Sequence, residues 1–142
     1  MKKRLIGDVH AKFRRYHQII KDCESSIQVG DFGLGFDDPG PVPPDHTFIR
    51  GNHDDPGRCV KHPNWIKDCT FEDGVGYIGG GLSIDRAYRI EGVSWWSDEE
   101  LSISQLFDAV DLYASKKPNV MITHDCPEFM AVRMRTDPRG TK

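Results

Sequence analysis

The stretch TFIRGNHDD, residues 47–55, joins an apolar segment to a glycine and then to four polar side chains in a row. Its first four residues predict a β-strand, because branched and aromatic side chains favour extended backbone, and Gly51 ends that strand. Asn52, His53 and Asp54 then stand together where the chain leaves a sheet. Such a group can bind a metal ion, transfer a proton or simply form a polar turn, and the rest of the sequence bears on that choice.

Three other apolar segments end in polar residues in the same way. They predict strands over residues 3–9, 26–29 and 120–123. The polar side chains at their ends are Asp8 and His10, then Asp31, and then His124 and Asp125. In α/β proteins, ligands bind beyond the carboxyl ends of the strands. We therefore expect these side chains and the polar group after Gly51 to form one site at one edge of a sheet.

The segments between these strands predict the helices and loops of an α/β fold. Apolar residues recur at helical spacing over residues 11–22 and predict a helix. Glycines and prolines interrupt residues 33–44 and predict a loop. A second helix is expected to end near residue 115. It begins at either Ser97 or Ser102, since serine is a favoured N-cap.

The middle and the end of the chain complete the predicted fold. Residues 75–85 and 88–96 carry glycines and alternating side chains, which predicts two antiparallel strands of a hairpin. Residues 127–134 predict a short helix. A length of 142 residues suits one hydrophobic core, so we expect a single domain over residues 1–142.

Composition and charge argue against several classes of protein. The formal net charge is −3 at pH 7, so the chain has no overall basic field that would indicate a nucleic-acid partner. No apolar run reaches the roughly 18–20 residues that cross a bilayer. The apolar stretch near the amino terminus is too short for a signal peptide, so we expect a cytoplasmic location. The four cysteines are scattered without a CxxC pair, which argues against a disulfide framework.

The polar clusters carry the ligand types of borderline divalent metals such as Mn²⁺, Fe²⁺, Ni²⁺ or Zn²⁺. The segments GDVH (7–10), GDFG (30–33) and GNHD (51–54) occur in that order, each after an apolar strand. This ordered set resembles the calcineurin-like metallophosphoesterases over about residues 3–125. The segment GLSIDRAYRIEGVSWWSDEEL (81–101) is similar to a hairpin-and-helix segment of the small prokaryotic and phage members. The resemblance implies an α/β sandwich, with mixed sheets flanked by helices.

The resemblance also implies a site for two divalent metal ions, with manganese the most expected and iron, nickel or zinc as alternatives. The implied ligands are Asp8 and His10 for the first ion, Asp31 as a bridge, and Asn52 and His124 for the second. A carboxylate suits the bridging position because it has two oxygens to share.

The reaction that the resemblance implies is hydrolysis of a phosphomonoester or phosphodiester without a covalent enzyme intermediate. A hydroxide that bridges the two ions would attack phosphorus, because bound metals lower the pKa of water. His53 would act as the general acid that protonates the leaving oxygen, and Asp54 would orient it. Arg50 is a candidate for contact with the substrate phosphate, with a surface ion pair as the alternative.

One motif of the family is missing from this sequence. Members carry a Gly-His-x-His motif after the strand that precedes His124, and that motif gives each metal one more histidine. None of the six histidines here lies beyond His124. Either the chain is truncated at its carboxyl end, which the polar, loop-like residues 136–142 favour, or it is a natural variant with a reduced site. In both cases we expect weaker metal binding and weaker activity.

Three functions stay open at this point. The first is a metal-dependent phosphoesterase that acts on a phosphate ester. The alternative is a catalytically weakened or non-catalytic binding module that keeps the fold, although such a role would leave the retained ligands unexplained. A nuclease would share the chemistry but predicts a basic groove, which the net charge of −3 does not support. No pattern in the sequence encodes the substrate, the preference for monoester or diester, or the oligomeric state.

Overall fold

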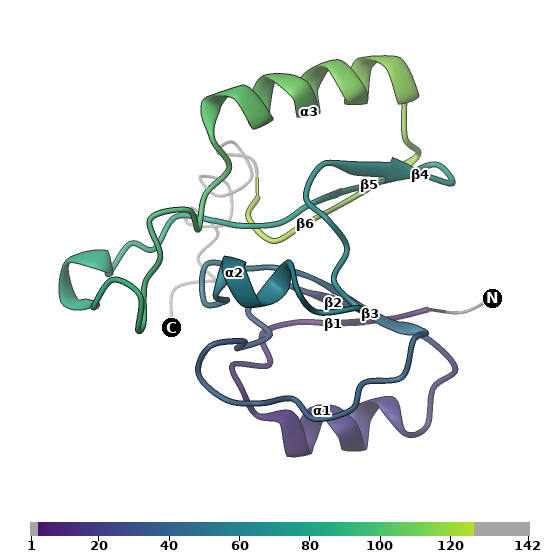
Figure 1. Ribbon diagram of the computed structural model, residues 1–142. Helices are drawn as coiled ribbons and strands as arrows, with labels where there is room; N and C mark the ends of the chain where they lie inside the picture. Colours follow the sequence, from purple (N-terminus) through teal and green to yellow (C-terminus); the bar gives the residue numbers. More distant parts are fainter. Residues whose placement is uncertain (1–2, 127–142) are drawn as a thin grey trace, which may run out of the picture.

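The computed structural model describes residues 3–126 of the chain (Figure 1). Within that part the strands are β1 (Arg4–Ile6), β2 (Ser26–Val29), β3 (His46–Ile49), β4 (Thr70–Glu72), β5 (Val75–Ile78) and β6 (Val120–Thr123). The helices are α1 (Phe13–Ile20), α2 (Pro56–Cys59) and α3 (Ile103–Lys116), with a short 3-10 helix η1 (Arg86–Tyr88) inside a loop. The predicted short helix over residues 127–134 lies outside the described residues.

The strands form two small sheets. β1, β2 and β3 are parallel and adjacent in that order, with Ser26 of β2 paired to both Arg4 and His46. In the second sheet β5 is antiparallel to β4 and parallel to β6. Figure 1 shows the sheets facing each other, with α1 outside the first and α3 outside the second. The predicted α/β class is confirmed, and the parallel register brings the ends of β1, β2 and β3 to one edge.

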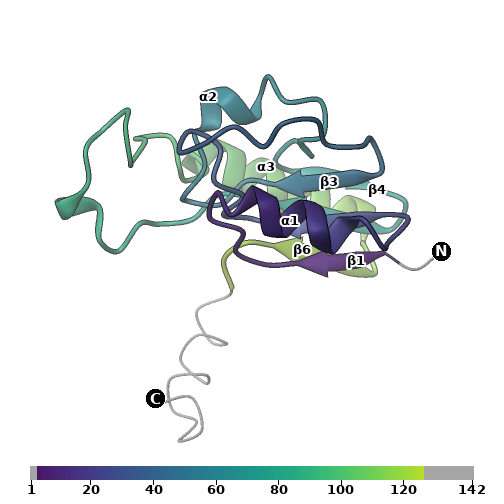
Figure 2. The same ribbon diagram turned by 90° about the horizontal axis from the view of Figure 1, so that it is seen from below.

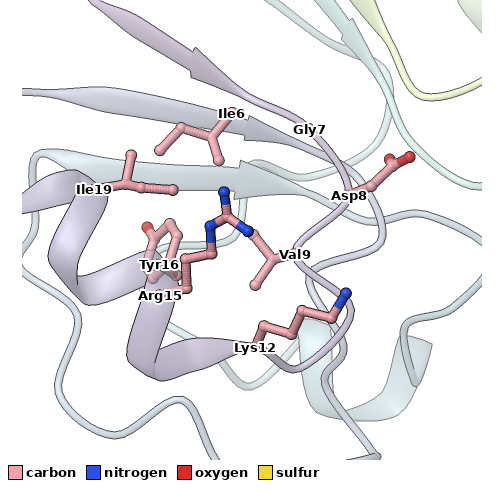
Figure 3. Close-up of a pocket in the computed structure, with 8 residues that line it drawn as sticks. All are labelled: Ile6, Gly7, Asp8, Val9, Lys12, Arg15, Tyr16 and Ile19. Atoms are coloured by element: carbon pink, nitrogen blue, oxygen red, sulfur yellow. The ribbon is translucent and has the colours of Figure 1, made fainter.

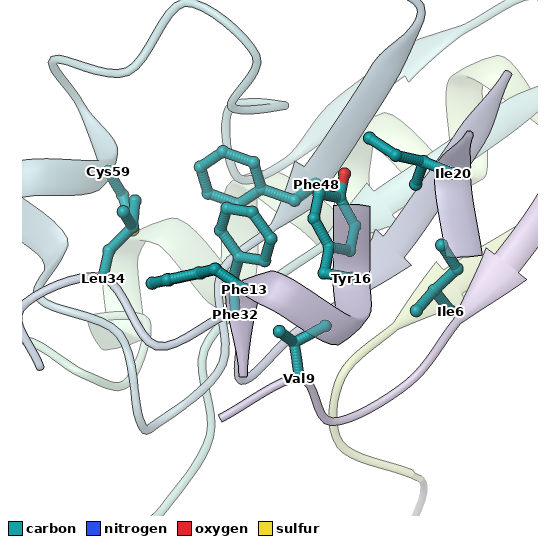
Figure 4. Packing of buried hydrophobic residues seen from close by; sticks show 9 residues of the cluster. All are labelled: Ile6, Val9, Phe13, Tyr16, Ile20, Phe32, Leu34, Phe48 and Cys59. Carbon is teal, nitrogen blue, oxygen red and sulfur yellow. The ribbon is translucent and has the colours of Figure 1, made fainter. Parts of the chain in front are cut away.

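An aromatic cluster packs α1 against the first sheet (Figure 4). The ring of Phe32 has no exposed surface. It meets Phe13 and Tyr16 edge-on, with ring centroids 5.1 and 4.9 Å away, and stacks on Phe48 at 4.8 Å. Such aromatic pairs contribute roughly 0.5–1.5 kcal/mol beyond the area that they bury. Because Phe32 directly follows Asp31, this packing fixes the loop that carries the Asp31 carboxylate.

A second, smaller cluster lies between the two sheets. Ile27 of β2 and Ile49 of β3 are buried together with Tyr77 of β5, and Ile122 of β6 packs against them. The first sheet is therefore covered on both faces, by α1 on one side and by the second sheet on the other. Consistent with this, Ser26, Ile27 and Gln28 of β2 are all buried, although polar and apolar residues alternate along that strand.

The predicted antiparallel hairpin of residues 75–85 with residues 88–96 is wrong. β5 pairs with β4 instead, and residues 79–96 form a loop that extends to one side in Figures 1 and 2. Consecutive glycines end the strand. Gly80 has a φ of +80°, and its N–H donates to the Arg50 carbonyl over 2.8 Å instead of joining a ladder.

The other predicted elements form largely as expected, most with shorter bounds, whereas β4 and α2 were not predicted. β2 and β6 match their predicted ranges residue for residue. Of the two candidate starts for the second long helix, Ser102 is the N-cap: its hydroxyl accepts from Gln105 N, and the Gln105 side chain accepts from Ser102 N. That helix, α3, has 14 residues, and no helix within residues 3–126 is long and apolar enough to cross a membrane.

We predict that Phe32→Ala lowers the free energy of unfolding by about 3–5 kcal/mol, because it empties the centre of the aromatic cluster. Urea denaturation followed by tryptophan fluorescence measures this loss. Leu5→Ala is the control, since Leu5 is 62% exposed and its truncation is expected to change stability by less than about 0.5 kcal/mol. Equal small effects of the two substitutions would contradict the central place of Phe32.

Candidate metal centre

Three loops leave the same edge of the first sheet, after β1, β2 and β3, and backbone hydrogen bonds join them. The N–H of His10 donates to the carbonyl of Asp31 over 2.8 Å, and the N–H of Ala11 donates to the carbonyl of Phe32 over 3.0 Å. The N–H of His53 donates to Asp31 Oδ1 over 2.9 Å. The loop after β2 is thus the middle one of three and contacts both neighbours.

The backbone is unusual at three of the five predicted metal ligands. Asp8, His10 and Asp31 have positive φ angles of 32°, 45° and 57°, and Ala11 follows at 59°. Non-glycine residues rarely adopt this left-handed region, and each such residue costs of order 1–3 kcal/mol. A cluster of them at one edge of a sheet is the kind of stored strain that marks functional sites.

Asp31 is the centre of the site. It is 5% exposed, and its two oxygens face different partners. Oδ2 lies 2.9 Å from His53 Nδ1 and 3.4 Å from His10 Nε2. Oδ1 lies 3.3 Å from His124 Nε2, on the side of the second sheet. One carboxylate therefore connects ligand atoms that come from β1, β3 and β6.

The first of these groups can hold a metal ion. His10, Asp31 and His53 each offer one ligand atom, and these atoms all lie within 4.8 Å of one another. His10 and Asp31 were predicted ligands. His53 was predicted as a proton donor instead, yet its Nδ1 belongs to this group, so metal ligation is a second role that the geometry allows for it.

The second group consists of Asn52 and His124 beside the other oxygen of Asp31. Asn52 Oδ1 lies 3.1 Å from His124 Nε2, and His124 Nδ1 lies 3.0 Å from the carbonyl of Val29. A ring N–H at Nδ1 can donate to that carbonyl, which directs Nε2 toward the oxygens of Asn52 and Asp31. The structure thus brings the side chains of Asp31, Asn52 and His124 together. The prediction that they lie at one edge of one sheet is wrong, because His124 follows β6 of the second sheet whereas Asp31 and Asn52 follow strands of the first.

The charges of the site reinforce one another. Burial acts to raise the pKa of Asp31, but hydrogen bonds from the His124 side chain and the His53 backbone, with the charges of both imidazoles, outweigh it and hold the pKa well below its ordinary value. Burial acts to lower the pKa of His124, but the hydrogen bond and charge of Asp31 and the Val29 carbonyl raise it overall. A cation at Nε2 would take the place of a proton between this nitrogen and the two oxygens that face it, Asp31 Oδ1 and Asn52 Oδ1.

Two motif glycines are required by this close packing. A Cβ on Gly51 would overlap Asp31 and come within 2.9 Å of His124 Nε2. A Cβ on Gly30, whose φ is +100°, would overlap the His124 ring. The glycines of GDFG and GNHD therefore make room for the side chains of the site.

Asp8 reaches the same edge but stands apart from the His10, Asp31 and His53 group. It is exposed, and in Figure 3 its carboxylate points away from Lys12 and Arg15, which line a pocket of about 220 Å³ beside α1. Its charge contributes to the raised pKa of His124. The structure thus places Asp8 near the predicted site without a direct contact to another ligand among the described residues.

The predicted role of Asp54 is wrong. Its carboxylate does not orient His53, because it is fully buried and accepts hydrogen bonds from four backbone N–H groups. The donors are Phe32, Gly33, Leu34 and Gly51, at 3.0, 2.6, 3.0 and 2.8 Å. Burial raises the pKa of Asp54, and these four donors act against that rise. Asp54 joins the loop after β2 to the loop after β3.

The predicted contact of Arg50 with a substrate phosphate is also wrong. Arg50 is 4% exposed, and its Nε lies 2.6 Å from Asp68 Oδ2. Its Nη1 donates to the carbonyls of Asp98 and Glu99 at 3.0 and 2.7 Å. The guanidinium therefore joins the end of β3 to the segment before α3 through hydrogen bonds. The alternative of an ion pair is correct, although the pair is buried rather than at the surface.

Arg89 is the cation that sequence reasoning missed at the site. Its Nη2 contacts His53 Nε2, and its Nε lies 2.8 Å from Asp85 Oδ1. Its Nη1 donates to the Ser94 carbonyl over 3.1 Å. The residue lies in the loop that was predicted as a hairpin. The spacing of Asp85 and Arg89, four residues apart, was the only local signal of this ion pair.

No family model, curated protein or solved structure matches the chain. The resemblance to the calcineurin-like metallophosphoesterases therefore stays a prediction, and the geometry of the site carries the functional argument.

We predict that Asp54→Ala lowers the free energy of unfolding by at least about 3 kcal/mol, because it leaves four buried backbone donors without an acceptor. Thermal and urea denaturation of the metal-free protein measure this loss. Asp55→Ala is the adjacent control. It removes the cap of α2, where Asp55 accepts from Gly57 and Arg58, and a partly exposed ion pair with Arg58, at a cost of about 1 kcal/mol. A stable Asp54→Ala protein would contradict the structural role of this carboxylate.

Proposed function

We propose that this protein is a metal-dependent phosphoesterase that hydrolyses phosphomonoesters or phosphodiesters, with His53 as the general acid. The observation that carries the proposal is the Asp31 carboxylate. One of its oxygens faces His10 and the other faces His124, at the point where the loops after β1, β2 and β3 converge. An acidic bridge between two sets of nitrogen and oxygen ligands suits a pair of divalent cations.

The donor set fits this assignment. We propose that Asp8, His10 and Asp31 hold one ion, and that Asp31, Asn52 and His124 hold the other. Mn²⁺ is the first candidate, with Fe²⁺, Ni²⁺ and Zn²⁺ as alternatives, because imidazole, carboxylate and amide oxygens together suit these metals. When bound, such ions lower the pKa of water and neutralise the charge of the phosphoryl group.

His53 supplies the proton in the proposed reaction. Its backbone N–H and its Nδ1 both face Asp31, at 2.9 Å each, so the ring is fixed in orientation. Nε2 is then the nitrogen directed away from Asp31, toward Arg89. Because a guanidinium only donates, Nε2 accepts from Arg89 in this arrangement. We propose that Nε2 carries the proton for the leaving oxygen once Arg89 has turned to the substrate phosphate.

Arg89 takes the role that the sequence suggested for Arg50. A guanidinium presents several N–H donors in one plane and suits the oxygens of a phosphate. Asp85 and the Ser94 carbonyl hold three nitrogens of Arg89, so the group is already oriented beside His53. We propose that it binds a non-bridging oxygen of the substrate.

One observation favours the second candidate, a metal-binding module without turnover. His53 Nδ1 lies in the group that can hold an ion, together with His10 and Asp31. If His53 ligates the metal through Nδ1, it is less able to act as the general acid, and turnover is expected to be lower. The same variant of His53 distinguishes the two functions.

We predict Mn²⁺-dependent hydrolysis of p-nitrophenyl phosphate or bis(p-nitrophenyl) phosphate, abolished by EDTA. His53→Ala is expected to lower kcat by about 10²–10⁴-fold, the usual contribution of a positioned acid, while leaving bound metal unchanged. His17→Ala on α1 is the control. Steady-state kinetics and elemental analysis give the two readouts. Loss of metal in His53→Ala would favour the binding module, and turnover that survives EDTA would overturn the proposal.

For Arg89→Ala we expect KM for the phosphate ester to rise about tenfold or more, because one charged contact with phosphate is lost. Metal content and thermal stability are expected to stay near those of the unmodified protein. Arg86→Ala is the matched control, three residues away in the same loop and exposed. Identical kinetics of both variants would show that Arg89 serves only to hold the loop.

A further inference from the structure

A buried hydrogen-bonded chain runs from Glu99 to Asn52 through Ser83. Ser83 N donates to Glu99 Oε1 and Ser83 Oγ donates to Glu99 Oε2, both over 2.7 Å. Asn52 Nδ2 donates to Ser83 Oγ over 3.1 Å. Ser83 is 1% exposed and Glu99 is 2% exposed. The chain thus connects the loop after β3, the loop after β5 and the segment before α3.

The direction of each hydrogen bond follows from the groups involved. A carboxylate only accepts, so the single hydroxyl proton of Ser83 goes to Glu99. The Ser83 oxygen then has lone pairs but no proton left for Asn52, and it must accept from the amide nitrogen. The amide oxygen is therefore turned the other way, where Asn52 Oδ1 lies 3.1 Å from His124 Nε2.

Glu99 is held firmly at the far end of this chain. Its backbone carbonyl accepts from Arg50 Nη1 over 2.7 Å and from the N–H of Gly81 over 3.2 Å. Burying a carboxylate costs free energy unless it is hydrogen-bonded, and both oxygens of Glu99 accept hydrogen bonds from Ser83. The hydrogen bonds of the Ser83 and Glu99 side chains go to each other and to Asn52 rather than to Asp31, so a direct part in the candidate metal centre does not account for them. A fixed direction for the Asn52 amide does.

We propose that Glu99 and Ser83 are positioning residues that keep the carbonyl oxygen of Asn52 directed at the metal site. This inference rests on the metal binding that is part of the proposed function. An amide binds a cation through its oxygen, whereas its NH₂ group would point hydrogens at the ion. The chain from Glu99 excludes that second orientation, so it sets the ligand character of Asn52 without touching the metal.

Glu99→Gln tests the proposal because it reverses the direction of the hydrogen bonds between Glu99, Ser83 and Asn52. The new side chain keeps an oxygen for Ser83 N and places an NH₂ group against Ser83 Oγ. The Ser83 hydroxyl then donates to Asn52, whose amide turns its nitrogen toward His124. We expect Mn²⁺ affinity, measured by isothermal titration calorimetry, to fall about 10–100-fold, as for other residues that orient a metal ligand. Glu100→Gln, at an exposed neighbouring position, is the matched control and is expected to bind Mn²⁺ normally.

A second background separates positioning from a general loss of structure. Asn52→Asp presents an oxygen in either orientation, so Glu99→Gln is expected to lower Mn²⁺ affinity less than threefold in that background. Melting temperatures of the metal-free proteins are recorded alongside. An unchanged affinity of Glu99→Gln, an equal loss in both backgrounds, or an unmodified protein that binds no Mn²⁺ would each overturn the proposal. Mn²⁺ binding with this pattern but without hydrolysis would remove only the phosphoesterase function.

Discussion

The buried carboxylate of Asp54 is the interaction on which the site depends. It accepts from three consecutive N–H groups of the loop after β2 and from Gly51 after β3. Loops at the end of a sheet ordinarily satisfy such donors with water. Here a single side chain does so, and the two loops become one rigid unit. Asp31 and His53 can then keep the spacing that their chemistry needs.

Strain and charge are concentrated on that rigid unit. Asp31 is held at a positive φ while its carboxylate is surrounded by imidazoles from β1, β3 and β6. The site stabilises the ionised carboxylate of Asp31 and places three imidazoles around it that can each bind a proton. A divalent cation would take the place of such protons, because it satisfies the carboxylate and the neutral imidazoles together. The electrostatics of the site and the proposed metal chemistry therefore have one physical origin.

The features that the sequence predicted correctly are local ones, and those it missed depend on contacts between distant segments. The strands β1, β2, β3 and β6, the helix α1 and the strand ends that carry Asp31, Asn52 and His124 were predictable, because apolar periodicity is local and motif residues follow strand ends. Asp54 and Arg50 were misassigned for a common reason. Each is adjacent to a functional residue in sequence, but each is spent on a buried partner that is distant along the chain. Their position beside functional residues in the sequence suggested a role in the reaction, whereas their burial gives them a structural role.

The sequence by itself determined the α/β class, the positions of β1, β2, β3 and β6 along the chain and the residue types at their ends, since these depend on short-range pattern. Only the tertiary structure decided which of those residues face the site. It turned residues 79–96 into a loop that brings Arg89 and Ser83 to the site, and it set Glu99 behind Asn52. Hydrogen bonds between segments far apart in the chain made that choice, and no local pattern encodes which buried donor will meet which acceptor.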